Sequence, residues 1–411
     1  MTQPAEHVPT LPAPEDAAPT RGGWLRPSEA LVEGASLWAF YACLYVLSGA
    51  LKPTPYIAHV YLAQAMLGGH FDIPSLPGWV EQTHVDGHHY LPYGIAPSLL
   101  MMPFVAIWGL DFRQGIFSAC LGALAVVAWW STLGHLRLAP AWRQALTAAY
   151  GMGSLFWFHA GQNGATWALM HVVANLGLML ALRGVVGRQH AWLAGFGFGL
   201  AVLSRQSIFL ALPFFVGMLW RDDRATGGAS IWRKALGFGL PLGLLMGFNG
   251  FYNWARFGNW LDNGYARTIH GMDDLPLGLF NVAYAAKHLE MYLVGVPLRL
   301  DTFPWFDPTL GGFSIFISTP ALAFFLFANW RERINWLALG AIVPILAFYV
   351  VYYWSGYSQF GCRYSLDFLP FAMLLVASAF RDRWYNALST VVTLGAVVQV
   401  WGLFWWGIKG L

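Results

Sequence analysis

Acids and histidines gather between residues 52 and 93, just ahead of an apolar segment that contains two prolines. A carboxylate near a lipid surface can act as a general base towards a hydroxyl group, because low-dielectric surroundings raise its pKa. We select Asp86 as the candidate base, since "DGHHYLPYG" combines an acid with aromatic and turn residues. His88, His89 and Tyr90 beside it are candidate substrate contacts. The alternative is that these are ordinary hydrated residues at a headgroup surface.

The whole stretch offers several other groups. Its ionisable members are Asp72, Glu81, Asp86, His59, His70, His84, His88 and His89. Histidines can share the task of a base, or they can bind a metal ion together with Asp86. Their spacing is not diagnostic of a metal site, so we predict no metal ligands.

Arg363 and Asp367 form a second candidate pair, in "QFGCRYSLDFLP". They stand four positions apart, so on an α-helix they share one face and can pair. A charge at the mouth of a membrane span is costly, and a functional role is the default interpretation. Arg363 can hold a phosphate through two hydrogen bonds, with Gln359 and Tyr364 nearby. The alternative, compatible with the first, is a structural Arg–Asp link between helices.

Two further arginines could contact a lipid headgroup. Arg256 and Asn253 follow an apolar segment in "FNGFYNWARFGNW" and are candidate headgroup or sugar contacts. Arg205 separates two short apolar segments, so it is either a phosphate ligand or a residue that reaches to the membrane surface.

The composition is that of an integral membrane protein. Of the 411 residues, 57% are hydrophobic and 10% are charged, whereas soluble domains carry about 25% charge. Long apolar runs recur along the chain, and helices satisfy their own backbone hydrogen bonds in lipid. We therefore predict an all-α polytopic protein of about 11–12 transmembrane helices. The apolar segments are 31–51, 94–110, 115–136, 142–161, 165–184, 191–204, 206–220, 233–255, 312–329, 334–354, 366–380 and 386–408.

The domain organisation is simple. Residues 1–28 are rich in proline, alanine and acids, which predicts a disordered cytosolic tail rather than a signal peptide. Residues 29–411 form a single membrane domain without a linker. Cys43, Cys120 and Cys362 are too scattered for a disulfide framework or a zinc site. The net charge of +3 gives no indication of nucleic-acid binding.

Lysine and arginine in short loops predict the orientation. Segments 183–189, 220–234, 330–333 and 381–384 are the cytosolic candidates, and 52–93, 256–311 and 355–365 lie outside. Twelve full crossings conflict with Arg137 and Arg143. The conflict disappears if 94–110, interrupted by Pro97 and Pro103, does not cross. Eleven crossings then place the amino terminus inside and the carboxyl terminus outside.

The external regions are rich in Trp, Tyr, His and Asp, so we expect function at the outer face. Within the first of them, 55–69 has the pattern of an interfacial helix. No phosphate-binding loop, dinucleotide fingerprint or serine-hydrolase elbow is present in a plausible context. An activated donor at the outer face would therefore arrive most naturally on a lipid carrier.

The ordered set of blocks resembles a known superfamily. The blocks are "YIAHVYLAQAMLGGHFD", "DGHHYLPYGIAPSLLMMPFVAIWG", "VLSRQSIFLALP", "YNWARFGNWLDNGY", "GGFSIFISTPAL" and "QFGCRYSLDFLP". The series resembles bacterial multispanning proteins of the GT-C glycosyltransferase superfamily, relatives of the protein mannosyltransferase and aminoarabinose transferase families. The resemblance covers roughly residues 50–371.

The resemblance implies inverting transfer of a sugar from a polyprenyl-phosphate donor at the outer face. It also implies interfacial helices and a catalytic acid in the first external loop. That acid usually follows the first span directly, where this chain reads "LKPTPYIAHVY" without a carboxylate. We therefore assign Asp86 as the base, with His59 as the second candidate because it lies nearer the usual position.

The predicted partners are a polyprenyl-phosphate lipid, membrane lipids and a glycan, lipid or protein acceptor, in a bacterial inner membrane. Arg363, Arg256 or Arg205 would stabilise the leaving phosphate. Two alternatives remain open: a transporter or flippase for lipid-linked saccharides, and a binding protein without catalytic activity. Transporters tend to show matching halves, and this chain shows none.

Overall fold

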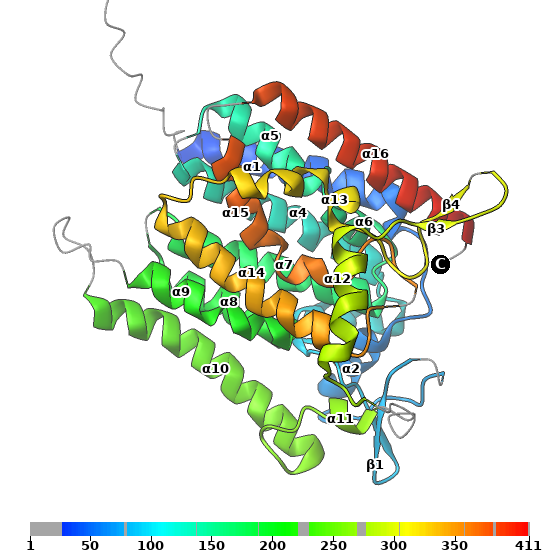
Figure 1. Cartoon of the computed structure of the whole chain (residues 1–411). Helices are drawn as coiled ribbons and strands as arrows, with labels where there is room; N and C mark the ends of the chain where they lie inside the picture. The colour runs from blue at the N-terminus through cyan, green and yellow to red at the C-terminus, as the bar shows by residue number, and fades with distance from the viewer. Residues whose placement is uncertain are drawn as a thin grey trace, which may run out of the picture.

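The computed structural model shows a bundle of helices with irregular segments gathered at one end (Figure 1). It describes residues 27–77, 80–136, 138–187, 189–220, 230–268, 277–303, 305–356, 358–380 and 384–409. The predicted tail therefore lies almost wholly outside the described residues, as do most of the basic residues in segments 220–234 and 381–384.

The amino-terminal half comprises the following elements: α1 (Pro27–Tyr45), η1 (Val46–Ala50), α2 (Ala58–Leu67), β1 (Thr83–Val85), β2 (His88–Tyr90), α3 (Ala96–Trp108), η2 (Gly109–Asp111), α4 (Gln114–Leu133), η3 (Gly134–Leu136), α5 (Pro140–Gly151), α6 (Leu155–Gly161), α7 (Thr166–Val185), α8 (Ala191–Ser204), η4 (Gln206–Ala211) and α9 (Leu212–Leu219). Here η1 is a π-helical turn, and η2, η3 and η4 are 3-10 helices.

The carboxyl-terminal half comprises α10 (Ile231–Phe257), α11 (Tyr265–Thr268), η7 (Val282–Tyr284), α12 (Ala285–Leu293), β3 (Leu298–Arg299), β4 (Phe306–Asp307), α13 (Ile315–Ser318), η8 (Pro320–Phe327), α14 (Arg333–Val351), η9 (Arg363–Asp367), α15 (Leu369–Phe380) and α16 (Tyr385–Lys409). The four strands form two antiparallel hairpins, β1–β2 and β3–β4. Apart from isolated bridges, the described residues contain no other sheet.

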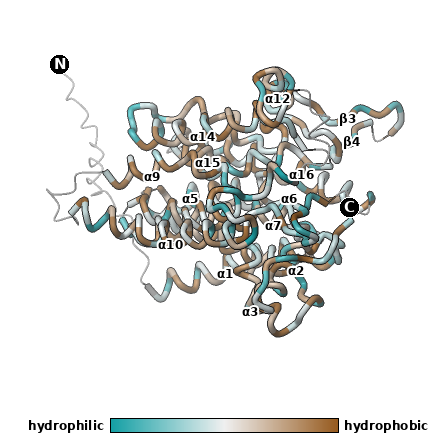
Figure 2. Tube along the Cα trace, turned by 90° about the horizontal axis from the view of Figure 1, so that it is seen from below, coloured by the Kyte–Doolittle hydropathy of each residue, from teal (hydrophilic) through white to brown (hydrophobic). Residues whose placement is uncertain are grey.

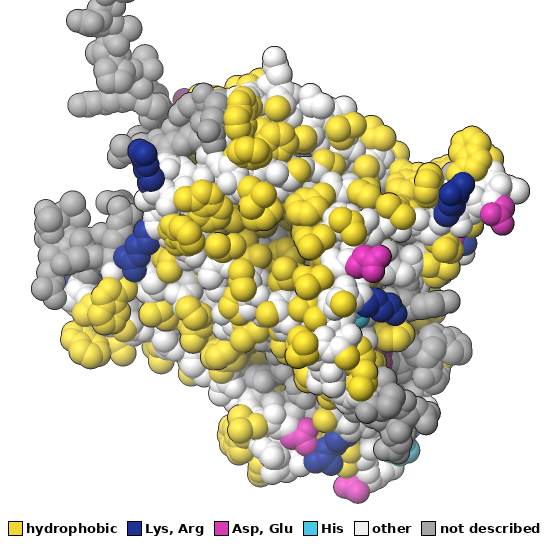
Figure 3. Space-filling view, viewed as in Figure 1, with side chains coloured by type: hydrophobic (Ala, Val, Ile, Leu, Met, Phe, Trp, Pro, Cys, Tyr) yellow, Lys and Arg dark blue, Asp and Glu magenta, His cyan; other side chains and the backbone are white. Residues whose placement is uncertain are grey.

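Six helices in the described residues are long and apolar enough to cross a membrane: α1 with η1, α4 with η3, α7, α10, α14 and α16. Shorter apolar helices in the described residues are Ala96–Asp111, Ala191–Ser204, Gln206–Leu219 and Leu369–Phe380. The fold is therefore all-α and polytopic, as the composition predicts. Apolar side chains cover the middle of the face seen in Figure 3, and the charged side chains on that face lie towards its two ends.

The short connections meet at one end of the bundle, which we call the short-loop end. There Arg183 at the end of α7 donates to Ser131 Oγ of α4 at 2.8 Å, and Arg333 at the start of α14 donates to the Gly217 carbonyl of α9 at 3.0 Å. Trp142 of α5 packs edge-on against Tyr385 of α16. The opposite end carries 51–95, 258–314 and 352–368, and we call it the loop end (Figure 2).

Within the described residues, the chain passes between the two ends eleven times. The passes are α1 with η1, α4, α5 with α6, α7, α8, η4 with α9, α10, α13 with η8, α14, η9 with α15, and α16. Several expected single spans are thus broken helices. The expected span 142–161, for example, is interrupted at 152–154. Helix α5 ends at Gly151, and Ser154 caps α6 by accepting a hydrogen bond from the Phe156 N–H.

Segment 94–110, which we expected not to cross the membrane, begins and ends at the same end of the bundle. At its start, Gly94 lies so close to the end of α8 that an added Cβ would meet the Leu203 and Ser204 carbonyl oxygens at 2.3 Å. Just past its end, Gln114 donates to the Tyr56 carbonyl at 2.9 Å. Both ends of α3 therefore lie at the loop end. Helix α2, also expected, packs beside it, and His59 Nδ1 lies 3.1 Å from Ser98 Oγ.

The carboxyl terminus is attached to the long second loop. Lys409 Nζ at the end of α16 donates to Asp307 Oδ2 of β4 at 2.8 Å. Burial raises the pKa of Asp307, but the hydrogen bonds from Lys409 and Thr309 outweigh it and leave the pKa below its ordinary value of 3.8. The pair therefore adds stability above that ordinary pKa, and this contribution is lost as the pH falls through the lower, folded-state pKa.

We predict that Asp307→Asn lowers the free energy of unfolding by about 1 kcal/mol at pH 7, a value reduced by solvent screening around the exposed Lys409. The difference from the wild type should shrink as the pH falls below 3.8 and through the lower, folded-state pKa, where Asp307 becomes protonated in the native protein. Thermal unfolding in detergent at neutral pH and at a pH below 3.8 measures this. Asp301→Asn, on the exposed part of the same hairpin, is the control and should have little effect at either pH. A loss that is the same at both pH values contradicts the electrostatic explanation.

Candidate functional site

The loop end contains a cavity of about 430 Å³, within the range of ligand-binding pockets. Its aromatic wall is formed by Tyr56, Phe158, Trp167, Trp354, Phe360 and Trp406. Its polar side chains are Glu81, His159, Gln162, Asn163, Gln359 and Arg363, with smaller residues between them. The walls come from five parts of the chain: the segment after η1, the first loop, α6 with the start of α7, the 354–363 segment and the end of α16.

The wall nearest the first span is held by a π-helical turn. In η1, Ser48 Oγ donates to the Leu44 carbonyl at 2.7 Å and accepts from Trp157 Nε1 at 2.9 Å. Extra turns of this kind bend a helix and are frequent at functional sites. The bend directs 53–56 towards α7, where Thr166 Oγ1 donates to the Tyr56 carbonyl at 2.8 Å. This contact places Tyr56 against Trp167, with ring centroids 5.0 Å apart.

Glu81 brings a carboxylate to the cavity. Tyr93 OH donates to Glu81 Oε2, and Trp167 Nε1 lies 3.3 Å from the same oxygen and 2.7 Å from Tyr93 OH. Among the described residues, both hydrogen bonds therefore go to one oxygen. The carboxylate is oriented by two aromatic side chains, and it is the only acid among the lining residues. This arrangement suits a general base.

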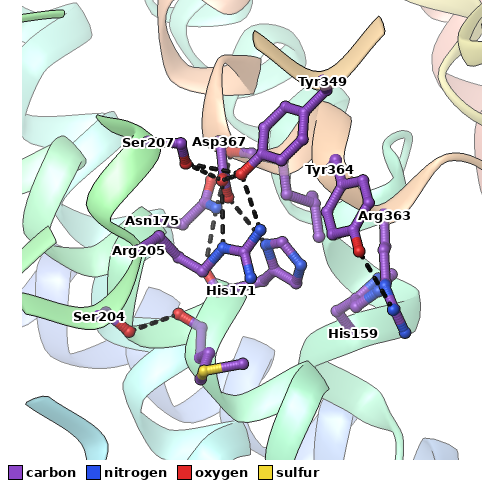
Figure 4. A network of polar contacts seen from close by, with 12 residues as sticks. His159, His171, Asn175, Ser204, Arg205, Ser207, Tyr349, Arg363, Tyr364 and Asp367 are labelled. Carbon is purple, nitrogen blue, oxygen red and sulfur yellow. Dashed lines mark hydrogen bonds and ion pairs between the residues drawn. The ribbon is translucent and has the colours of Figure 1, made fainter. Parts of the chain in front are cut away.

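Arg363 brings the cationic group. It follows the 354–360 wall and lies in the first turn of η9. Among the described residues, its guanidinium donates one hydrogen bond, to Tyr364 OH at 3.4 Å, and lies 5.2 Å from the centre of that ring. Figure 4 shows the side chain of Arg363 directed away from Asp367, beyond Tyr364. Most of its donors are thus available to an anion in the cavity.

Asp367 does not pair with Arg363, so that prediction is wrong. Residues 363–367 form a 3-10 helix with three residues per turn, and positions four apart then point in different directions. Asp367 is fully buried and accepts from Arg205 Nε at 3.1 Å, from Ser207 Oγ at 2.9 Å and from Tyr349 OH. His171 Nδ1 lies 2.9 Å from its other oxygen.

Arg205 is committed to this network (Figure 4). Its guanidinium also donates to Tyr349 OH at 2.7 Å, and 16% of the side chain is exposed. Tyr364 stacks on Tyr349 with centroids 4.5 Å apart. Neither Arg205, Tyr364 nor Asp367 lines the cavity. They belong to a mostly buried network that contacts Arg363 through Tyr364.

The β1–β2 hairpin holds the residues that the sequence analysis ranked first. Val85 pairs with His88, and Asp86 and Gly87 are the two turn residues between them. Both have positive φ, 51° for Asp86 and 81° for Gly87. Asp-Gly is strongly favoured in such turns, which gives Asp86 a conformational reason to be there. Its side chain is exposed and does not line the cavity.

The other predicted residues of the first loop also lie outside the cavity lining. His88 and His70 both bind Asp72, at 3.3 and 2.8 Å, and His89 stacks on His84. Tyr90 packs on Phe257 of α10. His59 is completely buried, and burial lowers its pKa to about 3, so its imidazole is neutral.

Arg256 and Asn253 hold the first loop against α10. Arg256 donates to the Leu91 carbonyl at 2.9 Å and to Asn253 Oδ1 at 3.0 Å, and its guanidinium stacks 3.6 Å from the centre of the Tyr252 ring. Asn253 donates to the Trp260 carbonyl at 3.1 Å. Of the predicted contacts, the structure therefore brings Gln359 and Arg363 into the cavity.

Glu81 was named among the acids of the first loop, but Asp86 was preferred to it; Trp167 and the polar run at the end of α6 were not identified. "HAGQNGATW" (159–167) places His159, Gln162 and Asn163 between two apolar spans, and this interruption was a usable signal. Glu81 had no such signal, since its position depends on contacts with Tyr93 and Trp167. Among the described residues, no group of three or more His, Cys, Asp or Glu side chains is placed to hold a metal ion.

We predict that Asp367→Asn lowers the free energy of unfolding by about 3 kcal/mol, because it leaves the buried Arg205 without its counter-ion. Thermal unfolding of the purified chain measures the loss. In the double variant Arg205→Met/Asp367→Asn the loss should be clearly smaller than the sum of the two single losses, since the residues interact directly. Additive losses would contradict the ion pair.

A solved structure shares this fold. No protein-family model matches the chain, and no curated protein sequence matches it. The crystal structure of ArnT from Cupriavidus metallidurans bound to undecaprenyl phosphate superposes with a TM-score of 0.54 at 11% identity, over 92% of this chain and 77% of that one. The apo oligosaccharyltransferase of Archaeoglobus fulgidus gives a TM-score of 0.49 at 12% identity, over 90% of this chain and 55% of that one.

Proposed function

We propose that this protein, a multi-pass membrane protein with the GT-C fold, transfers a sugar from a polyprenyl-phosphate donor to an acceptor at the loop end. The observation that carries the proposal is the cavity, in which one oriented carboxylate and one available guanidinium share an aromatic and amide-lined space. The solved structure of similar fold in complex with undecaprenyl phosphate supports a polyprenyl-phosphate ligand.

In the proposed reaction an acceptor hydroxyl attacks the anomeric carbon of the donor sugar. The hydroxyl proton passes to Glu81, a new carbon–oxygen bond forms, and the bond from the anomeric carbon to the phosphate oxygen breaks. Attack from the face opposite the phosphate inverts the configuration. Arg363 binds the leaving phosphate and stabilises its charge, while aromatic side chains such as Trp167 provide surfaces for the sugar. Glu81 thus takes the role that the sequence analysis gave to Asp86.

We further propose that the loop end faces the periplasm of a bacterial inner membrane and that the short-loop end is cytosolic. The arginines near the short-loop end support this orientation, among them Arg143, Arg183 and Arg333. Eleven passes then place the amino terminus in the cytosol and the carboxyl terminus outside. The acceptor, whether glycan, lipid or protein, would approach from the periplasm.

Transport is less well supported than transfer. The cavity is lined at the loop end alone, and the core behind it is filled by completely buried aromatic side chains such as Tyr150 and Phe156. A carrier of saccharides across the membrane would need access from both sides. Glu81 gives the cavity a carboxylate that can take a proton from a hydroxyl group, which supports an enzyme over a binding protein.

Mass spectrometry of lipids that copurify with the full chain tests the ligand. We expect the wild type to retain a polyprenyl phosphate or its sugar conjugate. Arg363→Gln should reduce the retained amount about tenfold, because a charge-assisted phosphate contact is lost. Arg256→Gln is the control, since Arg256 binds the first loop rather than the cavity. Equal retention by both variants and the wild type, or no isoprenoid lipid at all, contradicts this ligand.

The identified donor then allows a test of the base. We expect Glu81→Gln to lower kcat for sugar transfer by about 100-fold or more, the usual contribution of a general base, while donor retention is unchanged. Asp86→Asn should stay within about twofold of the wild type, because Asn also tolerates the turn conformation. The reverse pattern, a large loss in Asp86→Asn with normal rates in Glu81→Gln, would restore Asp86 as the base.

A further inference from the structure

A second cleft lies near the short-loop end, at the opposite end of the bundle from the cavity. It is lined by Glu33, Ser36, Leu37, Tyr41, Trp130, Gln144 and Thr147, and its volume is about 290 Å³. These residues come from the middle of α1, the last turn of α4 and the first turns of α5. At 1.5 Å per residue, Trp130 lies about 5 Å from the end of α4, and Thr147 lies about 10 Å from the start of α5. This depth matches the headgroup region of a lipid leaflet.

The indole N–H of Trp130, a residue that lines the cleft, is an unsatisfied donor. Trp130 is 95% buried, with an exposed fraction of 5%, and its Nε1 has no hydrogen-bond partner among the described residues. A buried N–H without an acceptor is costly, so an acceptor from outside the protein would stabilise it. Arg143 fixes the ring, because its guanidinium lies 3.6 Å from the ring centre and its Nε donates to the Trp130 carbonyl at 3.0 Å.

The cleft also presents an acid. Glu33 is partly buried on a helix whose neighbouring side chains Leu31 and Val32 are exposed, as expected of a lipid-facing surface. A carboxylate in such a position is expensive unless it has a partner. Arg143 is near enough for their charges to interact, yet the two residues form no ion pair within 4.0 Å. Glu33 is the only charged side chain in the lining, so the cleft favours a cationic group there.

We propose that this cleft binds the headgroup of an aminophospholipid from the leaflet at the short-loop end. The primary ammonium lies against Glu33 and donates hydrogen bonds to its carboxylate. The phosphate accepts from Trp130 Nε1 and from the Gln144 amide, while the charge of Arg143 close behind Trp130 favours the anion. Ammonium and phosphate are joined by a short linker in such lipids, and both groups fit between α1 and the α4–α5 pair.

A choline headgroup provides the sharpest comparison. It keeps the phosphate and the positive charge but has no N–H to donate, so its interaction with Glu33 is weaker. We therefore expect native mass spectrometry of the full chain to detect about tenfold more phosphatidylethanolamine than phosphatidylcholine of the same acyl chains bound at equal concentration.

Two variants separate the two halves of the site. Glu33→Gln should remove the preference, so that both lipids bind equally. Trp130→Phe keeps the ring that stacks on Arg143 but removes the N–H, and it should weaken binding of both lipids to a similar extent. Glu29→Gln, one turn earlier on α1 and outside the cleft, is the control and should retain the preference.

The proposal is overturned if the wild type binds the two lipids equally, or if Glu33→Gln keeps the preference. A shift of the thermal midpoint by added phosphatidylethanolamine provides an independent readout and should disappear in Glu33→Gln. If Trp130→Phe does not fold, the comparison of Glu33→Gln with Glu29→Gln still decides. None of these measurements depends on the sugar-transfer reaction.

Discussion

The buried ion pair between Arg205 and Asp367 is the constraint on which the loop end depends. Its partners come from four parts of the chain: His171 from α7, Arg205 and Ser207 from the α8–η4 junction, Tyr349 from α14 and Asp367 from η9. A buried charge is tolerated only when its hydrogen bonds are satisfied, so each of these segments must keep its position. The 3-10 geometry of η9 then directs Arg363 away from Asp367 and into the cavity.

The first loop is attached to this frame by separate contacts, and Glu81 depends on them. Thr83, two residues further on, donates through Oγ1 to the Gly264 carbonyl at 3.1 Å, and Arg256 binds the Leu91 carbonyl. Trp167 at the start of α7 reaches both Glu81 and Tyr93. The carboxylate is thus positioned by two loops of the loop end and a core helix. This explains how an irregular loop can hold one side chain at a defined place.

The fold was accessible from the sequence because the signal for membrane helices is long and repeated. Apolar runs predicted the passes, and the two prolines in 94–110 together with the basic short loops predicted that this segment does not cross. The site was less accessible. Arg363 was identified because a charge in an apolar segment is conspicuous, and Gln359 because it stands in the same polar stretch. Glu81 was passed over, because a loop acid gains its environment only from residues distant in sequence. Asp86 was selected as the base because it is an acid in this loop, but the hairpin turn already favours Asp at that position.

The packing of the interior between the cavity and the short-loop end limits the route by which the proposed donor could reach Glu81. Tyr150 and Phe156 stack with centroids 4.6 Å apart, and Tyr45 OH donates to the Gly151 carbonyl at 2.7 Å. All three side chains are completely buried, and interiors of this kind are close-packed. A sugar cannot pass through such a core without large rearrangement. In the proposed reaction, a donor would therefore have to enter from the membrane or the solvent at the loop end. A lipid carrier whose headgroup already lies in that leaflet meets this requirement, because its phosphate arrives at the depth of the cavity while its hydrocarbon chain remains in the bilayer.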